Sequence, residues 1–381
     1  MRVEAFREHF PAAATGPYFA TNGYGLLPTT ARDAVVEAVG RLSDRGYAAH
    51  ARYERGVDDV RARLAAMIGA TADEVGFVRN TADGMGFAAE SLPTEPDDEV
   101  VVFDGDYGTV VYPFLARQRR GELMVRVVAP PPDGVITAEV VAAAIRPNTK
   151  AIALSWVRFD SGARSDIAAI GHVCRERGVW CIVDAIQGLG VFPLDVHAAG
   201  VDVVAAGCHK WQCGLAGLGV LYVAAERWAS LRPTRAGLDA FDHPADSLST
   251  GYPFELRPSV ARVEDGAKPE VAIAALGASL TLFEAVGMAA VSAQVRTVTD
   301  ALCAGWRDLG GVVRSPRHAD SWSGIVALES PPSIDGRGLL ADLVRGGAAL
   351  GERNGALWIG AHAYTTVTDA EFVLAAARSR R

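Results

Sequence analysis

The most informative residues for chemistry are a lysine and a carboxylate, each placed directly after a short apolar run. Lys210 follows the run Val201–Ala206, and Asp184 follows the run Val179–Val183. Such runs predict buried strands, and ligands of α/β proteins bind at the carboxyl ends of parallel strands. A buried lysine without a partner is costly, so an amine at this place indicates a covalent role or a bound anion. A satisfied structural carboxylate remains the alternative for Asp184.

A short polar turn is the second feature that predicts a ligand. Asn80, Thr81 and Ala82 follow the apolar run Glu74–Val78 and precede a helical pattern. A helix that begins directly after a strand presents free backbone N–H groups, and these groups together with the helix dipole favour a phosphate. Ordinary N-capping by Thr81 explains the same residues without any ligand.

Together these features predict pyridoxal 5'-phosphate as the cofactor. This cofactor requires an amine for a Schiff base, an acid beside its pyridine nitrogen and an anion-binding turn for its phosphate. Lys210, Asp184 and the turn Asn80–Ala82 supply these three parts, and Gln187 lies shortly after Asp184. An ionised acid keeps the ring nitrogen protonated, so the ring can accept negative charge from the Cα of a substrate.

The elements that must position these residues alternate between strands and helices. Short Val- and Ile-rich runs without polar alternation predict strands covered on both faces, as in a mostly parallel sheet. One helix is predicted over Val57–Ile68, and Ser165 or Asp166 caps a second helix that Gly178 ends after Arg177. This alternation predicts an α/β domain with right-handed crossovers. The predicted strands are Glu74–Val78, Glu99–Phe103, Ala151–Trp156, Val179–Val183, Val201–Ala206 and Gly219–Val223.

The last third of the chain follows a different pattern and predicts a smaller α+β domain. A long helix is expected from about Pro269 and a final helix from Thr368, with Thr368 and Glu371 in a capping-box pattern. We predict a large domain over residues 20–255 and a small domain formed by residues 1–19 and 256–381. The predicted strands of the small domain are Val312–Arg314, Ile325–Glu329 and Leu357–Ile359.

Composition and charge narrow the classes of partner. The 381 residues carry a formal net charge of −8 with both signs spread along the chain, so neither nucleic acid nor an anionic membrane is an expected partner. The five cysteines show no metal-ligand spacing, and no metal site is expected. Neither a signal peptide nor an apolar run of about 18 residues is evident. The sequence therefore predicts a cytoplasmic chain in a reducing compartment.

The motifs of the chain resemble those of a known family. They are similar to the motifs of fold-type-I pyridoxal-phosphate enzymes of the class V aminotransferase group, which includes cysteine desulfurases and isopenicillin-N-epimerase-like proteins. The resemblance extends from about Phe19 to Ala375, and the motifs follow the order of the family. They are the runs Arg79–Ala82, Asp106–Tyr107, Ser155–Gly162, Val183–Gly188, His209–Trp211 and Arg262–Gly266.

The resemblance implies a role for each matching residue of the cofactor site. Lys210 corresponds to the lysine that forms the Schiff base, Asp184 to the partner of the pyridinium nitrogen, and Gln187 to the residue that hydrogen-bonds the phenolic oxygen. Phosphate contacts are implied for the side chains of Thr81 and His209 and for the backbone of Ala82, in the turn that Asn80 begins.

The resemblance also implies a stacking residue and a second subunit. Tyr107 stands where the family places an aromatic ring over the cofactor, and a core tyrosine is the alternative for this residue. A homodimer is expected, with active sites at the interface and the loop at Gly266 reaching the phosphate of the neighbouring subunit.

Several positions depart from the pattern of the family. Gly207 and Ala267 replace a Ser and a Thr that contribute hydroxyls to the phosphate in many members, and no cysteine occurs between Arg314 and Arg381. The missing cysteine disfavours a persulfide-forming desulfurase, which needs a thiolate on a loop in this region.

The region expected to meet the substrate also departs from the family. Trp358 stands where relatives commonly have the arginine that clamps the α-carboxylate of the substrate, a bond that Trp cannot make. Arg353 or another cation must replace it, or the carboxylate is held loosely. Asn22, Arg353 and Trp358 are therefore the predicted substrate residues.

These departures favour a lyase that acts on a bulky or unusual amino acid, most specifically on a cysteine whose sulfur carries a large substituent. Lys210 would act as the general base at Cα, and β-elimination would release a thiol, pyruvate and ammonia. A decarboxylation-coupled deamination to an aldehyde is the alternative, and epimerisation or transamination are further ones. From another class, a non-catalytic binding protein is disfavoured because Lys210 and Asp184 are both present.

Overall fold

The computed structural model describes residues 1–232, 235, 237, 240–241, 255–264 and 266–380. Its main sheet is built from β1 (Val75–Val78), β2 (Glu99–Phe103), β3 (Met124–Val128), β4 (Thr149–Ser155), β5 (Trp180–Asp184), β6 (Val203–Gly207) and β7 (Gly219–Val223). The order across the sheet is β1-β7-β6-β5-β4-β2-β3. Only the pairs made by β7 are antiparallel, so the predicted α/β class with a mostly parallel sheet is confirmed.

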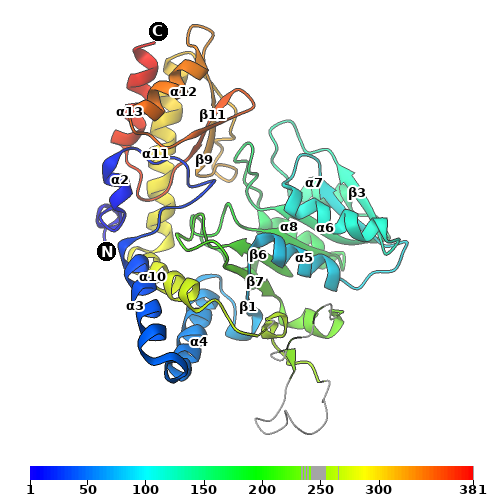
Figure 1. Cartoon of the computed structure of the whole chain (residues 1–381). Helices are drawn as coiled ribbons and strands as arrows, with labels where there is room; N and C mark the ends of the chain where they lie inside the picture. Colours follow the sequence, from blue (N-terminus) through cyan, green and yellow to red (C-terminus); the bar gives the residue numbers. More distant parts are fainter. Residues whose placement is uncertain (233–234, 236, 238–239, 242–254, 265, 381) are drawn as a thin grey trace.

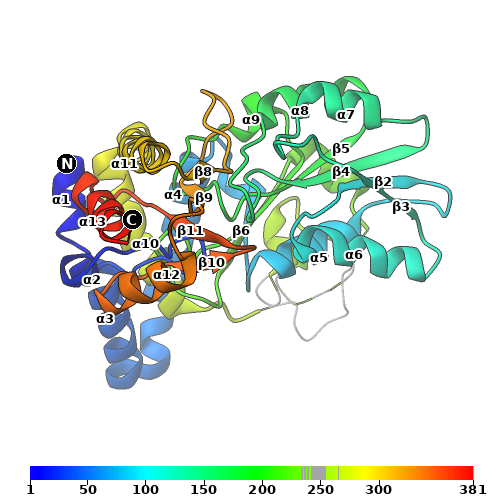
Figure 2. The ribbon, with the colours of Figure 1, turned by 90° about the horizontal axis from the view of Figure 1, so that it is seen from above.

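Helices cover both faces of this sheet, as Figure 2 shows. One face carries α5 (Thr81–Ser91) and α6 (Gly108–Arg119), and the other carries α7 (Ala138–Ala144), α8 (Ile167–Glu176) and α9 (Val196–Ala199). Alternate residues of a strand point to opposite faces. In β2, Val100 and Val102 therefore join the core under α5 and α6, whereas Val101 and Phe103 join the core under α7 and α8.

The predicted strands are confirmed apart from small shifts at their ends, but β3 was not predicted. This strand lies at the edge of the sheet, and its residues are only partly buried. Its side chains therefore lack the continuous apolar run of a strand covered on both faces. Arg126 interrupts the run and forms an ion pair of 2.8 Å with Glu99 on β2.

The capping of α8 resolves an alternative left open by the sequence. The carboxylate of Asp166 accepts hydrogen bonds of 3.1 Å from the backbone N–H groups of Ala168 and Ala169, so Asp166 and not Ser165 is the cap. Gly178 takes a φ of +68° just beyond the helix, a conformation that favours glycine.

A helical layer beside the sheet joins distant parts of the chain (Figure 1). Here α10 (Glu270–Val286) packs against α3 (Thr29–Arg45) and α4 (His50–Met67), and α4 begins before the predicted Val57. A buried ion pair of 2.6 Å between Arg61 of α4 and Glu264 ties the segment before α10 to this layer. Glu264 also accepts a hydrogen bond of 2.8 Å from the backbone of Phe77 in β1. The segment with the Arg262–Gly266 motif is thereby fixed to the edge of the main sheet.

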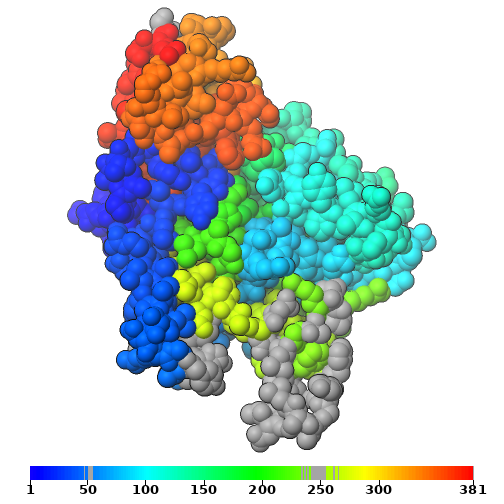
Figure 3. All heavy atoms as spheres, in the orientation of Figure 1, coloured from blue at the N-terminus to red at the C-terminus, as the bar shows by residue number. Residues whose placement is uncertain are grey.

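The C-terminal third forms a four-stranded sheet with the order β10-β11-β9-β8. Its strands are β8 (Val312–Val313), β9 (Ile325–Glu329), β10 (Gly351–Arg353) and β11 (Ala356–Gly360), and its helices are α11 (Met288–Asp308), α12 (Gly336–Arg345) and α13 (Val367–Arg378). The N-terminal α1 (Val3–Arg7) and α2 (Pro11–Thr15) lie near these helices, as Figures 1 and 3 show. Ala20 pairs with Gly360 at the end of β11, and Phe19 is buried in the core of this region. The exact domain boundaries stay a prediction.

The start of α13 corrects one expectation. The capping box is formed by Thr366 and Asp369, two residues before the predicted pair Thr368 and Glu371. Both pairs have the same spacing, so the sequence pattern does not separate them. The earlier start is favoured because Asp369 also forms an ion pair of 2.6 Å with Arg7 of α1. This contact joins the two ends of the chain and is invisible in the local pattern.

Among the described residues, no single helix is long and apolar enough to cross a membrane. By length and composition alone, α10 and α11 pass that test only as a pair, which is bent by 82° between them.

Candidate active site

One cavity of about 400 Å³ lies at the carboxyl ends of β4, β5 and β6. All the predicted site residues except Gly266 line it, so the structure brings together segments that are far apart in the sequence. They are Asn22, Asn80, Thr81, Ala82, Tyr107, Asp184, Gln187, His209, Lys210, Arg353 and Trp358.

Lys210 follows the last residue of β6 by three positions, and its side chain lines the cavity. Burial lowers the pKa of the Lys210 amine, the charge of Asp184 opposes this effect, and the charge of Arg353 adds to it. Within the described part of the chain, no side chain forms an ion pair with this amine. A larger share of the amine is therefore neutral than for an exposed lysine, which suits a nucleophile or a base.

Asp184 is the last residue of β5, and only 2% of it is exposed. Its carboxylate accepts a hydrogen bond of 2.9 Å from the backbone N–H of Ile186. Burial raises the pKa of Asp184 to about 7, the negative charge of Asp106 adds to the rise, and Lys210 opposes it. The carboxylate is thus costly to ionise until a cation lies beside it.

Asp106 acts on this site from behind the cavity wall. Its carboxylate accepts hydrogen bonds from the backbone N–H of Ser155 at 2.9 Å and from the hydroxyl of Ser155 at 2.6 Å. Although the residue is only half-buried, burial of the carboxyl group raises the pKa of Asp106. The two acidic groups therefore influence each other, although β4 lies between β5, which Asp184 ends, and β2, which Asp106 follows.

The polar turn predicted as a phosphate site begins α5. The side chain of Asn80, not that of Thr81, caps this helix by accepting a hydrogen bond of 2.9 Å from the N–H of Asp83, which corrects the capping role considered for Thr81. The hydroxyl oxygen of Thr81 instead accepts a hydrogen bond of 2.8 Å from the backbone N–H of Gly207. A Cβ at Gly207 would lie 3.2 Å from both the His209 ring and this hydroxyl, which is a tight contact. Glycine at this position avoids that crowding.

The N-terminal segment closes one side of the cavity through a very close backbone contact. The N–H of Gly25 donates a hydrogen bond of 2.8 Å to the carbonyl of His209. A Cβ at Gly25 would lie 1.9 Å from the carbonyl oxygen of Lys210, so this position requires glycine. The segment places Asn22 in the cavity, where the residue is 1% exposed and both polar atoms of its side-chain amide lack a hydrogen-bond partner.

Aromatic rings and one arginine form the wall near the small sheet. The guanidinium carbon of Arg353 lies 4.6 Å from the centroid of the Phe159 ring and 4.8 Å from that of the Trp358 ring. The indole N–H of Trp358 donates a hydrogen bond of 3.0 Å to the backbone carbonyl of Phe159, which ties the Trp358 ring to the backbone of Phe159. Among the described residues no carboxylate pairs with Arg353, so its N–H donors are available to a ligand.

Tyr107 and Gly266 have different positions relative to this cavity. Tyr107 is 48% exposed and its ring lies edge-on to Phe159 at 5.0 Å, so the alternative of a core tyrosine is wrong. Gly266 has a φ of +125° and is not among the residues around the cavity. Asp265 of the same motif lies outside the described residues.

Sequence reasoning did not single out every residue of the site. Thr109, Ser155 and Phe159 line the cavity, and Asp106 is hydrogen-bonded to Ser155 behind it, but no individual role was predicted for these residues. Asp106, Ser155 and Phe159 fell inside motifs that resemble the family. Thr109 was recognisable only from its place at the start of the helix after Tyr107.

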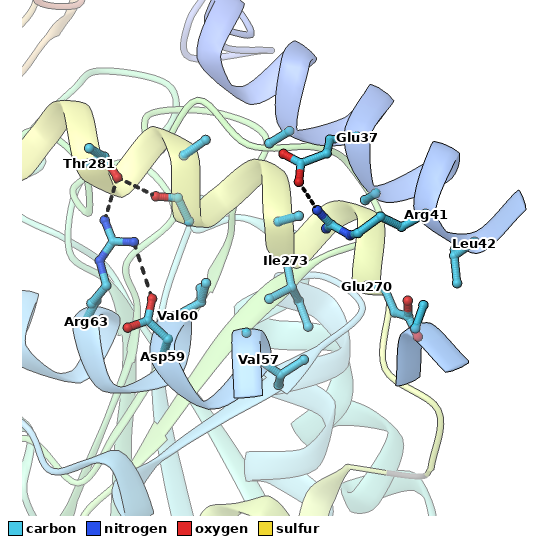
Figure 4. A pocket seen from close by; sticks show the side chains of 17 residues that line it. Glu37, Arg41, Leu42, Val57, Asp59, Val60, Arg63, Glu270, Ile273 and Thr281 are labelled. Carbon is cyan, nitrogen blue, oxygen red and sulfur yellow. Dashed lines mark hydrogen bonds and ion pairs between the residues drawn. The ribbon is translucent and has the colours of Figure 1, made fainter. Parts of the chain in front are cut away.

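A second cavity of about 390 Å³ lies between α3, α4 and α10 (Figure 4). The charged side chains around it pair with one another: Arg41 with Glu37, and Arg63 with Asp59 and with the hydroxyl of Thr281. Small side chains such as Ala34 and Ala38 line the rest. Its charged groups are satisfied within the chain, in contrast to Lys210 and Arg353 in the first cavity.

The fold, together with a lysine and a carboxylate on one cavity, agrees with the class of proteins that bind pyridoxal 5'-phosphate. The chain belongs to the aminotransferase class-V family, whose model matches residues 30–349. Members of this family use pyridoxal 5'-phosphate as their cofactor.

Individual relatives carry several descriptions. The chain is 31% identical over 237 residues to an uncharacterized protein of Schizosaccharomyces pombe, covering 61% of this chain and 54% of that protein. It is 28% identical over 261 residues to a probable cysteine desulfurase of Methanothermobacter thermautotrophicus, covering 68% of this chain and 64% of the relative. The matched part is thus less than two thirds of the length of these relatives. A solved structure of the cystine C–S lyase C-DES with its product cysteine persulfide is similar in fold, with a TM-score of 0.87, 23% identity and coverage of 96% and 98% of the two chains.

The residues around the first cavity fit this cofactor. The Lys210 amine has no ion-pair partner among the described side chains, and the amide of Asn22 is buried without a hydrogen bond. Buried polar groups are normally satisfied, so these two groups indicate that a polar ligand completes the cavity. The beginning of α5 at Thr81 and the carboxylate of Asp184 supply an anion site and an acid on the same cavity.

Proposed function

We propose that this enzyme is a lyase that breaks the C–S bond of an S-substituted cysteine and releases a thiol, pyruvate and ammonia. The observation that carries this proposal is the position of Arg353, which lines the same cavity as Lys210 and pairs with no carboxylate of the described residues. A cation at this place is expected to bind the α-carboxylate of an amino acid through charge-assisted hydrogen bonds.

In the proposed reaction, bound pyridoxal 5'-phosphate supplies an electron-accepting ring that stabilises negative charge at Cα of the substrate. Lys210 takes the Cα proton on its Nζ atom. The lowered pKa of this amine leaves more of it neutral and therefore able to accept a proton. Asp184 holds a negative charge at the buried end of the cavity and thereby keeps a positive charge on the ring nitrogen. The roles of Thr81, Ala82 and His209 as phosphate contacts and of Gln187 as a contact of the phenolic oxygen belong to this proposal.

The electron balance of the overall reaction is simple. The electron pair of the Cα–H bond forms a Cα=Cβ bond while the C–S bond breaks with its pair on sulfur, which takes up a proton to give the thiol. The aminoacrylate that results gains a proton at Cβ, and water replaces its nitrogen to give pyruvate and ammonia. Neither an oxidant nor a reductant is required.

The cysteines of the chain support a lyase over a persulfide-forming desulfurase. The chain has five cysteines, Cys174, Cys181, Cys208, Cys213 and Cys303, and all of them are buried. Burial raises the pKa of Cys208 and of Cys213 above the ordinary value of a thiol, and neither residue lines the cavity. A thiolate nucleophile needs a lowered pKa and access to the substrate. The sulfur is therefore expected to leave directly as a thiol.

We also propose that the enzyme is a homodimer in which Gly266 of one subunit reaches the phosphate of the other. Its position away from the cavity of its own subunit is consistent with this role. Three apolar side chains of α3, Val36, Val39 and Leu42, are 66%, 51% and 40% exposed and would be covered by a partner. Light scattering is expected to give twice the 40.1 kDa of one chain. The mass of a single chain at micromolar concentration would contradict this part of the proposal.

The proposed reaction is tested by supplying a panel of S-substituted cysteines to the purified enzyme with cofactor. We expect equal amounts of thiol and pyruvate from at least one member of the panel, and none from the Lys210→Ala variant. Mass spectrometry of the products separates the alternative, because decarboxylation keeps the C–S bond and gives an aldehyde. The absence of both thiol and pyruvate across the panel would refute the lyase assignment.

A further inference from the structure

Gln187 lies in the cavity between two groups whose hydrogen-bonding roles are fixed. The indole N–H of Trp211 donates a hydrogen bond of 2.6 Å to Oε1 of Gln187. On the other side, Nε2 of Gln187 donates a hydrogen bond of 3.0 Å to the backbone carbonyl of Asn22. Gln187 is 3% exposed and Trp211 is 1% exposed, so water does not compete for these bonds.

These two contacts determine the orientation of the Gln187 amide, that is, the positions of its oxygen and its nitrogen. An indole nitrogen can only donate, so the atom facing Trp211 must be the amide oxygen. A backbone carbonyl can only accept, so the atom facing Asn22 must be the amide nitrogen. The amide nitrogen carries two hydrogens, and the carbonyl of Asn22 uses one of them. The second remains for a ligand in the cavity that Gln187 lines together with Lys210 and Asp184.

Trp211 itself has little freedom to move. The Nε2 atom of His362 lies 2.9 Å from the carbonyl oxygen of Trp211, and the two rings are stacked with an interplanar angle of 25°. Burial lowers the pKa of His362 to about 4, so this ring is neutral and donates through one nitrogen only. On the other side, a Cβ at Gly324 would lie 2.7 Å from the indole ring, which shows how closely the backbone packs there.

We propose that Trp211 is a positioning residue: its indole N–H occupies the amide oxygen of Gln187 and thereby obliges Gln187 to present an N–H donor to an oxyanion beside Lys210. The proposal rests on the proposed function, in which that oxyanion is the phenolic oxygen of the cofactor. Without the indole N–H, only the hydrogen bond to the carbonyl of Asn22 still orients the amide of Gln187, so its N–H donor is held less firmly toward the oxyanion.

The pH at which the Lys210 nitrogen loses its proton depends on whether Gln187 donates this hydrogen bond. In the holoenzyme the phenolic oxygen would attract the proton on the Lys210 nitrogen, and an N–H donor from Gln187 to the same oxygen would weaken that attraction. Loss of the donor is therefore expected to raise the pH at which the cofactor's absorbance band titrates. A single hydrogen bond to an ionised group predicts a rise of about one pH unit.

The test is a spectroscopic pH titration of four holoenzymes: the wild type, Trp211→Phe, Gln187→Leu and the double variant. We expect both single variants to raise the titration midpoint, and the double variant to rise no further than Gln187→Leu alone, because Trp211 acts only through Gln187. Trp306→Phe is the matched control. It removes an equally buried indole whose N–H donates to the carbonyl of Glu329 at 2.8 Å in the small sheet, and its midpoint should equal that of the wild type.

A second variant keeps the test valid if Trp211→Phe fails to fold. Replacement of Trp211 by the benzothiophene analogue of tryptophan, in which sulfur replaces the N–H, preserves the ring shape and should give the same rise. An unchanged midpoint in this variant, or a further rise of the midpoint when Trp211 is altered in the Gln187→Leu background, would overturn the positioning role. Failure of the wild type to form an absorbance band that borohydride removes would instead refute the proposed function itself.

Discussion

Arg353 and Trp358 lie on the same face of a short β-hairpin, with the guanidinium carbon of Arg353 4.8 Å from the centroid of the indole ring. The hairpin pairs Arg353 with Ala356 and Gly351 with Trp358. Its turn is Asn354-Gly355, and both residues have a positive φ, of 52° and 77°. Such a turn matches the twist of two adjacent strands and fixes their register. The register therefore brings an arginine from five residues earlier next to the tryptophan at the position where the resemblance leads us to expect an arginine.

Arg353→Ala is expected to weaken substrate binding more than the chemical step. Charge-assisted hydrogen bonds to a carboxylate are worth about 1.5–3 kcal/mol, which predicts a rise in KM of about 10- to 100-fold with a smaller change in kcat. Steady-state kinetics with the best substrate of the panel measures both constants. The control is Arg345→Ala, because Arg345 lies on α12 with its side chain 74% exposed, and its ion-pair partner is the nearby Asp342. A KM for Arg353→Ala equal to that of the control would exclude the clamp.

Two substitutions of Trp358 separate its hydrogen bond from its aromatic face. Trp358→Phe keeps a ring beside Arg353 but loses the hydrogen bond to the carbonyl of Phe159, whereas Trp358→Ala loses both. A cation–π contact is worth about 0.5–2 kcal/mol, so we expect KM to rise about 3- to 30-fold in the alanine variant and clearly less in the phenylalanine variant. Equal KM values for the two variants would show that the ring face does not position Arg353.

Asp184→Asn should change how the stability of the cofactor-free protein depends on pH. Burial raises the pKa of Asp184 to about 7, above the value of about 3.9 for an aspartate in an unfolded chain. The folded state therefore binds more protons between these two pH values, and the wild type loses stability as the pH rises toward 7. Asn cannot ionise and is free of this cost.

The expected result is a difference in unfolding free energy that grows with pH. Between pH 5 and pH 8 the advantage of Asp184→Asn over the wild type should increase by about 2–3 kcal/mol. Urea unfolding of both proteins without cofactor measures it at each pH. The same substitution should weaken cofactor binding, because the ring nitrogen loses its anionic partner. A difference in stability that stays constant from pH 5 to pH 8 would contradict the raised pKa.

Gly25→Ala tests the close contact between the N-terminal segment and the backbone of Lys210. Because the new Cβ would lie 1.9 Å from the carbonyl oxygen of Lys210, one of the two segments must shift. Overpacking of this kind costs about 1–3 kcal/mol, so we expect a lower unfolding free energy and faster loss of the cofactor on dialysis. Gly40→Ala in α3 is the matched control, since its Cβ meets no atom within 4 Å and should stabilise the helix by about 1 kcal/mol. Equal behaviour of the two variants would show that the contact does not hold Lys210.

Much of the cofactor site could be predicted because its residues follow features that are local in the sequence. Lys210, Asp184 and the turn at Asn80 each come at or just after the end of an apolar run, and the carboxyl ends of parallel strands meet at one edge of a sheet. The start of α13 could not be predicted in the same way. There, a contact between Arg7 and Asp369 from opposite ends of the chain favoured one of two capping patterns with the same spacing.

The sequence by itself determined the class of the fold, the cofactor, and the lysine and carboxylate expected to serve it, because periodicity and strand ends are encoded within short segments. The tertiary structure decided which side chains complete the site. The place of Arg353 depends on the register of a hairpin, and the orientation of the Gln187 amide depends on Trp211 and on the carbonyl of Asn22. Such contacts join residues separated by up to 165 positions, and they arise only when the segments pack together.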